Sequence, residues 1–184
     1  MADEFTAQDL DPEILPHVYV QSYKTETRIE GVSFLDITDH IGEDGNFCEV
    51  LRLDETGHLE GFPNFQLAQM NRTTQLGGTI KAWHLHYKQD ELWYVPPPYT
   101  IFLGLWDLRK NSPTKGVANR VVLDGNRPQI VYIPHGVAHG STVYEQDSVN
   151  LYYFINRKFD ISNPDEQRIP WDYLGADFWK PKRD

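Results

Sequence analysis

The stretch that decides the fold is "TIKAWHLHY", residues 79–87, in which bulky apolar residues alternate with two histidines. Successive side chains of a β-strand point to opposite faces, so His84 and His86 share one face while Trp83 and Leu85 share the other. The alternation predicts a strand that buries its apolar face and turns both imidazoles toward a cavity or the solvent. Imidazoles about 7 Å apart along a strand can converge on one ion or one substrate.

Short segments rich in branched and aromatic residues continue on both sides of this strand, separated by turn-forming stretches such as "GEDGN" and "DGNRP". Helix signals are confined to the ends, in "AQDLDPEIL" (7–15) and "NPDEQRIPWDYLG" (163–175). Ten short strands at this spacing predict an all-β sandwich or barrel with short terminal helices. The expected strands are "GVSFLDI" (31–37), "FCEVLRL" (47–53), "FQLAQMN" (65–71), "TIKAWHLHY" (79–87), "ELWYV" (91–95), "TIFLGLWDL" (100–108), "RVVLD" (120–124), "QIVYIP" (129–134), "STVYE" (141–145) and "VNLYYFI" (149–155).

Length and composition limit the possible partners. The 184 residues predict a single domain over 1–184, with an N-terminal arm over about 1–28 and a C-terminal extension over about 160–184. A net charge of -10 argues against nucleic acid or an anionic membrane as a partner. The single cysteine excludes an internal disulfide, no apolar run could span a bilayer, and the start lacks the pattern of a secretory signal. We therefore expect a cytoplasmic protein.

A third histidine stands in "IPHGVAHG" (133–140), where His139 follows a Pro-x-Gly turn. The two histidine segments resemble the motifs of the cupin superfamily, Gly-x5-His-x-His-x3,4-Glu and Pro-x-Gly-x-x-His, although Val143 stands where the second motif usually has an asparagine. This resemblance implies a double-stranded β-helix, the jelly-roll barrel of the cupins. In metal-binding cupins these positions hold a divalent transition metal, whereas a His-x-His pair on a half-exposed strand is more often non-ligating. The metal candidates are His84, His86, Glu91 and His139.

A longer resemblance covers most of the chain from about residue 30. "GEDGNFCE", "QMNRTTQLGGTIKAWH", "DLRKNSPTKG", "IPHGVAHG" and "PDEQRIPWDYLGADFW" resemble, in this order, segments of the dTDP-4-dehydrorhamnose 3,5-epimerase family. The family's chemistry is proton abstraction next to a sugar ketone, which needs a base, a group that holds the enolate charge, and an acid on the opposite face. The resemblance implies a cytoplasmic homodimeric isomerase that acts on a nucleotide sugar and requires no cofactor.

Carried over position by position, the resemblance implies roles for single residues. His84 falls on the family's base, Tyr152, thirteen residues after His139, falls on its acid, and Lys81 replaces an arginine that holds negative charge. Strict alternation would turn Lys81 away from His84, so this role requires a bulge in the strand. Gln69, Asn71, Arg109 and Glu49 match positions expected near the substrate or beneath it; alternatively, Arg109 braces the barrel and Glu49 is a surface charge.

The chain also departs from the family. "QDE" (89–91) occupies the region of a lysine that helps hold the enolate, Asp44 replaces an arginine, and the ending "WKPKRD" lacks the aspartate that orients the base. The His-x-His pair resembles the histidine pair of related sugar ketoisomerases. By this resemblance, His86 of this chain would relay or donate the second proton. The sequence therefore leaves three hypotheses: a divergent nucleotide-sugar epimerase or ketoisomerase, a metal-dependent cupin enzyme, and a non-catalytic sugar-binding relative.

Overall fold

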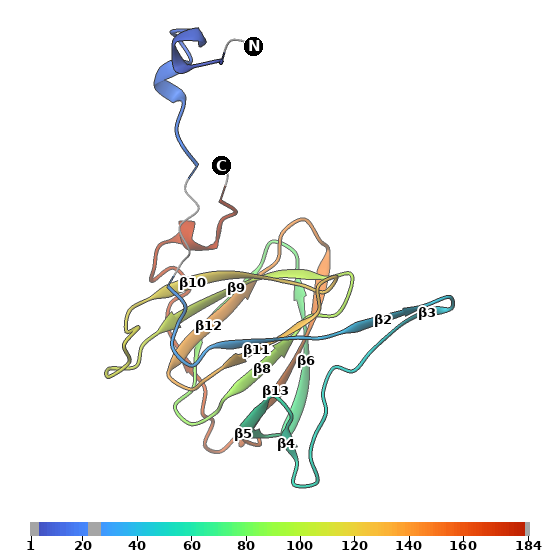
Figure 1. The fold of residues 1–184 in the computed structure, drawn as a ribbon. Coiled ribbons are helices and arrows are strands. Elements are labelled where there is room, and N and C mark those ends of the chain that lie inside the picture. Colours follow the sequence, from blue (N-terminus) through green and yellow to red (C-terminus); the bar gives the residue numbers. More distant parts are fainter. Residues whose placement is uncertain (1–3, 22–26, 183–184) are drawn as a thin grey trace.

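Two five-stranded antiparallel sheets face each other in the computed structural model, which describes residues 4–21 and 27–182 (Figure 1). The first sheet has the order β1 (Ser33–Asp36), β11 (Gln129–Ile133), β8 (Glu91–Tyr94), β13 (Ser148–Ile155) and β6 (Gln69–Leu76). The second has the order β10 (Ala118–Asp124), β9 (Thr100–Asp107), β12 (Val137–Thr142), β7 (Ile80–Leu85) and β14 (Gln167–Arg168). This arrangement confirms the predicted all-β jelly-roll barrel.

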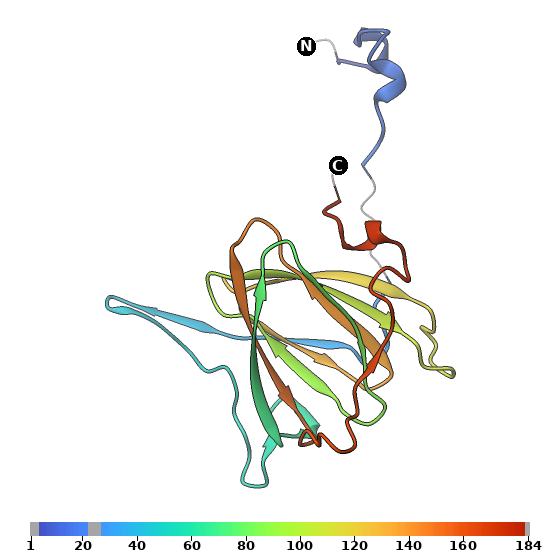
Figure 2. The ribbon, with the colours of Figure 1, turned by 180° about the vertical axis from the view of Figure 1, so that it is seen from behind.

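Each sheet has an inner face toward its partner and an outer face covered by a loop segment. The largest buried cluster joins the inner faces, with Leu103 and Leu105 of β9 packed with Val131 of β11. The outer face of the first sheet is covered around β4 (His58–Leu59) and β5 (Phe62–Gln66). The outer face of the second is covered by the C-terminal segment, which carries the 3-10 turn η3 (Ala176–Trp179) (Figure 2).

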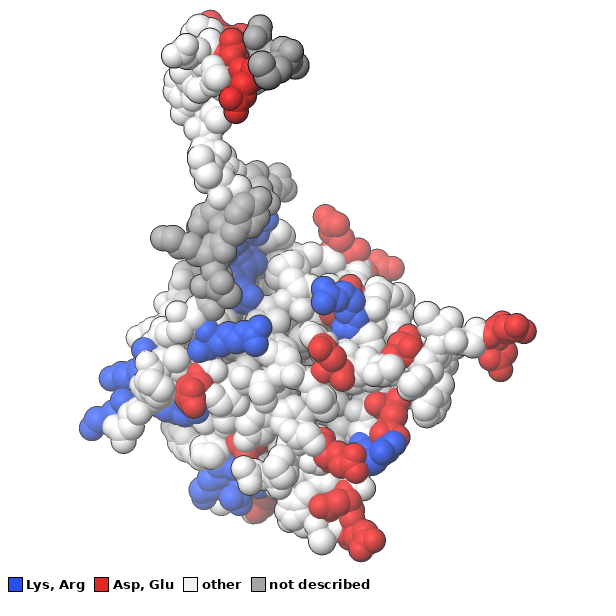
Figure 3. All heavy atoms as spheres, in the orientation of Figure 1, with Lys and Arg blue, Asp and Glu red and all other residues white. Residues whose placement is uncertain are grey.

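The β2 (Asp39–Gly42) and β3 (Gly45–Cys48) hairpin forms an arm that projects from the barrel (Figure 1). Ile41 and Phe47 on this arm are 87% and 67% exposed. Acidic side chains stand at its tip, where Glu43 and Asp44 form the turn (Figure 3). The arm thus carries apolar surface that its own barrel does not cover.

Four sequence expectations about elements differ from the structure. Of the strand expected over 47–53, only residues 47–48 are strand, at the end of β3. The stretch 163–175 is not helical, because its Gln167–Arg168 pair joins the open edge of β7 and Pro164 and Pro170 are poor helix-interior residues. The stretch 7–15 forms only the 3-10 turns η1 (Ala7–Asp9) and η2 (Leu15–His17), whose residues are all exposed and therefore have no packing to extend them. Strand β12 begins at Val137, before the expected 141–145, since it pairs with both β9 and β7.

No helix among residues 4–21 and 27–182 is long and apolar enough to cross a membrane.

Candidate functional site

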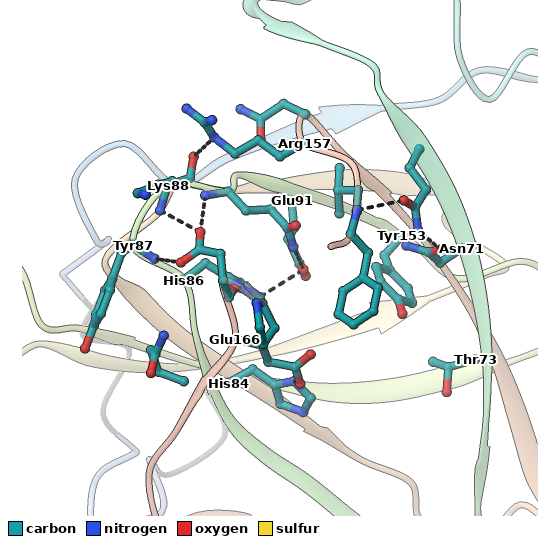
Figure 4. A pocket seen from close by; sticks show the side chains of 18 of the residues that line it. Asn71, Thr73, His84, His86, Tyr87, Lys88, Glu91, Tyr153, Arg157 and Glu166 are labelled. Atoms are coloured by element: carbon teal, nitrogen blue, oxygen red, sulfur yellow. Dashed lines mark hydrogen bonds and ion pairs between the residues drawn. The ribbon is translucent and has the colours of Figure 1, made fainter. Parts of the chain in front are cut away.

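A cavity of about 1230 Å³ opens between the two sheets (Figure 4). Strand β7 supplies one wall, β6 and β13 supply the opposite wall, and residues 156–168 form part of the rim. Six of the residues singled out from the sequence as site candidates line it together with Tyr153. The lining includes Gln69, Asn71, Lys81, His84, His86, Glu91 and Tyr153.

The bulge that the role of Lys81 requires is present in β7. Pairing with β12 runs from His139 opposite His84 to Ser141 opposite Lys81, so β7 holds one residue more than its partner over this span. An extra residue reverses the alternation of side chains, and Lys81 therefore faces the same cavity as His84. Its ammonium donates hydrogen bonds to Thr73 Oγ1 at 2.9 Å and to the Thr74 carbonyl at 3.0 Å.

Two charged residues of the C-terminal segment contact His84. Its Nδ1 atom lies 3.3 Å from Glu166 Oε1, and its Nε2 atom lies 2.8 Å from a guanidinium nitrogen of Arg168. Burial lowers the pKa of His84 to about 3, and the charges of His139 and Arg168 act in the same direction. The imidazole is therefore neutral at pH 7, which is the form that can accept a proton.

His86, Glu91 and His139 form a buried triad beside His84, each 5% exposed or less. The two oxygens of Glu91 face one imidazole each: Oε1 lies 3.1 Å from His86 Nε2, and Oε2 lies 3.2 Å from His139 Nε2. Gln89 Nε2 and Trp93 Nε1 also donate to this carboxylate, at 2.8 and 2.6 Å. Burial alone would raise the pKa of Glu91, but the neighbouring His139 and His86 outweigh it and hold that pKa well below its usual range.

Backbone carbonyls contact the Nδ1 atom of both imidazoles in the triad, the ring nitrogen that does not face Glu91. His86 Nδ1 contacts the Asp165 carbonyl, and His139 Nδ1 lies 3.1 Å from the Val137 carbonyl. Because a carbonyl oxygen only accepts, both Nδ1 atoms carry protons and both Nε2 atoms point toward Glu91. Nε2 of His139 makes no aligned hydrogen bond despite its burial, and its closest charged neighbour is Glu91 Oε2 at 3.2 Å.

The tyrosine that reaches the cavity is Tyr153, and Tyr152 faces the opposite side of β13. Tyr152 packs with the cluster on the outer face of the first sheet, whereas Tyr153 packs with the inner cluster and lines the cavity. The expectation that Tyr152 is the acid rests on its spacing of thirteen residues after His139. The segment between these two residues contains a turn at Glu145, which has a φ of 52°. One residue of difference in such a turn moves every later side chain to the other face.

Arg109 and Glu49 also lie outside the cavity. The guanidinium of Arg109 is held by the buried Asp107, at 2.9 Å from Nε to Oδ1, and donates to the Glu30 carbonyl. It braces the barrel, as one of the two alternatives proposes. Glu49 follows the projecting arm, where it pairs with Arg52 at 2.8 Å.

Glu166 and Arg168 are the site residues that the sequence reasoning missed. Both stand in "PDEQRIP", which we expected to be helical, whereas a two-residue spacing on an extended segment puts them on one face. The pairing of β14 with β7 sets Arg168 opposite His84. The two-residue spacing of Glu166 and Arg168 could have indicated that they share a face, but only if the segment had been recognised as extended.

The model of the family described as dTDP-4-dehydrorhamnose 3,5-epimerase matches residues 26–178. The chain belongs to this family. Among its relatives is the spore coat polysaccharide biosynthesis protein SpsL of Bacillus subtilis, which is 37% identical over 144 residues, covering 78% of this chain and 91% of SpsL. The probable low-salt glycan biosynthesis epimerase Agl13 of Haloferax volcanii is 28% identical over 144 residues, covering 78% of this chain and 89% of Agl13.

Solved structures of the family share the fold. The 4-keto-6-deoxy sugar epimerase NovW of Streptomyces spheroides superposes with a TM-score of 0.69 at 25% identity, covering 89% of this chain and 83% of NovW. This family member thus keeps the barrel of its relatives.

Proposed function

We propose that this family member isomerises a nucleotide-linked 4-keto-6-deoxysugar by moving a proton at a carbon next to the ketone. The observation that carries the proposal is that His84 on β7 and Tyr153 on β13 enter one cavity from opposite sheets (Figure 4). Inversion at a carbon requires removal of a proton on one face and its return on the other. A base and an acid on facing walls meet this requirement.

His84 takes the proton, and the electron pair of the broken C–H bond moves to the carbonyl oxygen as an enolate. The ammonium of Lys81 is a cation on the same wall that can hold this charge. Tyr153 then donates its phenolic proton to the opposite face of the carbon. Burial raises the pKa of Tyr153, and the charges of Glu91 and Glu166 raise it further, so the phenol is protonated and ready to donate. These steps use only side chains of this chain.

The rim of the cavity suits the diphosphate of a nucleotide sugar. Lys88, Arg157 and Lys158 line the rim and are exposed, although the whole chain has a net charge of -10. A local group of cations on an acidic protein favours an anionic ligand at that place. Gln69 and Asn71 offer amide groups on the β6 wall, where Gln69 Nε2 donates to Asn71 Oδ1 at 2.7 Å.

Exchange of solvent deuterium into dTDP-4-keto-6-deoxyglucose tests the function. The wild-type protein is expected to incorporate deuterium next to the ketone, and the substitution His84→Ala is expected to abolish it. The matched control is His17→Ala, because His17 is an exposed histidine of η2 outside the cavity. Binding of the sugar nucleotide without any exchange by the wild type would instead identify a non-catalytic sugar-binding relative.

A second candidate function follows from the buried triad. Nitrogen atoms of His86 and His139 and an oxygen of Glu91 all lie within 4.8 Å of one another, and both rings present Nε2 while Nδ1 is bound to a carbonyl. Metal-ligating histidines show this outer hydrogen bond, and two imidazoles with one carboxylate suit a divalent transition metal. Such an ion would polarise a substrate oxygen. His84 is not within this group, because Arg168 occupies its Nε2 atom.

Titration of the chelator-treated protein with Co²⁺ or Ni²⁺ decides this candidate by calorimetry. We expect one site per chain that is lost in Glu91→Gln and kept in His17→Ala. An absence of binding at micromolar metal would leave the triad as a proton-sharing network in which His86 donates from both nitrogens.

We also propose that the chain forms a homodimer. The arm with the exposed Ile41 and Phe47 supports this, since apolar surface of this kind is usually covered by a partner. Sedimentation of the wild type and of Phe47→Glu tests it, with a shift to monomer expected in the variant.

A further inference from the structure

The C-terminal segment closes a ring of contacts around the base. In the β14–β7 pair, Arg168 stands opposite His84, so the two side chains are cross-strand neighbours. The two ends of the Arg168 fork reach different groups: NH1 lies 2.8 Å from His84 Nε2, and NH2 lies 2.5 Å from Glu166 Oε1. The same Glu166 oxygen lies 3.3 Å from His84 Nδ1. Both nitrogens of the imidazole are therefore in contact with this pair.

These contacts define which nitrogen of His84 carries the proton. A guanidinium has donors only, so His84 Nε2 must accept from Arg168 through its lone pair. The proton of the neutral ring is then on Nδ1, where the Glu166 carboxylate faces it. A carboxylate at Nδ1 holds a general base in the tautomer that leaves Nε2 free to take a proton.

We infer that Glu166 is the positioning residue for the His84 base and that Arg168 is a catalytic residue that holds the enolate oxygen. The inference rests on the proposed function. Glu166 would take the role that the family pattern gives to an orienting aspartate, and Arg168 the role that it gives to a lysine beside the enolate. Arg168 belongs to β14 at the edge of the second sheet, and Glu166 directly precedes this strand.

The arrangement gives Arg168 two successive partners. Without substrate, its NH1 group donates to His84 Nε2, the atom that must take the proton. When a ketone enters, its carbonyl oxygen lies beside the carbon that loses its proton. The same N–H group can then donate its hydrogen bond to that oxygen instead of to the imidazole. His84 Nε2 is thereby released as the negative charge develops one bond away. Glu166 keeps the other end of the fork and the ring orientation during this exchange.

Nitrogen-15 NMR of the substrate-free protein tests the positioning part without any turnover. The wild-type spectrum is expected to show His84 with its proton on Nδ1. Glu166→Gln removes both the carboxylate at Nδ1 and the charge that holds the Arg168 fork at Nε2, so it is expected to give a mixture of both tautomers. Wild-type His84 protonated on Nε2 would overturn the inference whatever the variants do. The matched controls are Glu55→Gln and Arg127→Gln, which change exposed residues away from the cavity.

Kinetics with the 4-keto sugar nucleotide test the catalytic part. Arg168→Gln is expected to lower kcat about 100-fold with little change in KM, because loss of one oxyanion donor costs about 10²–10³. Arg168→Lys should recover part of this loss, since it keeps the charge. Glu166→Gln is expected to lower kcat on the order of 100-fold through misorientation of the base.

The outcomes separate this inference from the proposed function. An active wild type with kcat unchanged in both variants would overturn the inference and leave the function standing. An inactive wild type with the expected Nδ1 tautomer would overturn the proposed function and, with it, the enolate role of Arg168, while supporting the positioning contact of Glu166.

Discussion

Replacing either of two adjacent tyrosines by phenylalanine distinguishes the acid of the proposed reaction. Tyr153→Phe removes only the phenolic O–H that enters the cavity, and Tyr152→Phe removes the same group on the outer face of the first sheet. A general acid contributes about 10²–10⁴ to a rate, which is roughly 3–5 kcal/mol of activation free energy at 1.36 kcal/mol per factor of ten. A substitution outside the site usually changes free energies by less than about 0.5 kcal/mol, or roughly twofold. The two variants should therefore differ in inversion rate by at least about 50-fold.

The assay follows deuterium and configuration at the same carbon in deuterated buffer. His84 can still take and return a proton in Tyr153→Phe, and its proton exchanges with the solvent. We therefore expect deuterium incorporation with retained configuration to continue while the inverted product is lost. Tyr152→Phe should give inverted, deuterated product at nearly the wild-type rate. Loss of inversion in Tyr152→Phe but not in Tyr153→Phe would refute the assignment made from the faces of β13.

Three further substitutions test separate parts of the structure. Lys81→Met should lower kcat/KM about 10- to 160-fold in steady-state kinetics, because a hydrogen bond to a charged group contributes about 1.5–3 kcal/mol. Gly140→Ala should destabilise the protein by about 1–3 kcal/mol in urea unfolding, since the new Cβ would lie 2.3 Å from Ala82 Cβ at the β7 bulge. Asp107→Asn should lower Tm by roughly 6–12 °C, from about 3 kcal/mol for a broken buried pair and about 2–4 °C per kcal/mol. Burial raises the pKa of Asp107, but hydrogen bonds from Arg109 and two hydroxyls outweigh it and lower that pKa, so its contribution is present above the unfolded pKa of about 3.9 and is lost as the pH falls below it. Asp107→Asn should therefore flatten the acid end of the stability profile measured by thermal melts from pH 7 to pH 3.

The fold was predictable because its main signals are local. Alternation in "TIKAWHLHY" places Trp83 on a fully buried face and His84 and His86 on the cavity face, as β7 confirms. Turn-forming stretches mark most strand ends, since Gly, Asn and Asp adopt the backbone conformations that turns require. The segment 163–175 escaped prediction because its strand has only two residues, and the open edge of β7 rather than its own propensity makes it extended.

The candidate site was predictable where its residues share a strand and less so where they come from different ones. Gln69 and Asn71 on β6, Lys81 and His84 on β7, and His86 directly after β7 all line the cavity. The position of the acid depends on the number of residues in the β12–β13 turn, and sequence spacing alone does not show which face a strand presents after a turn. Arg109 matches a family segment, yet its guanidinium is held by Asp107 outside the cavity.

The departures from the family form one connected arrangement. Glu91, in the region where the family has a lysine, would add negative charge beside a developing enolate and oppose the reaction if it were alone. His86 and His139 stand within 3.2 Å of its two oxygens, and Gln89 and Trp93 donate to it as well, so four neighbouring groups compensate its charge. The cations for the enolate therefore stand at other positions, Lys81 on β7 and Arg168 on β14. Arg168 is beside the base because β14 pairs with the edge of β7.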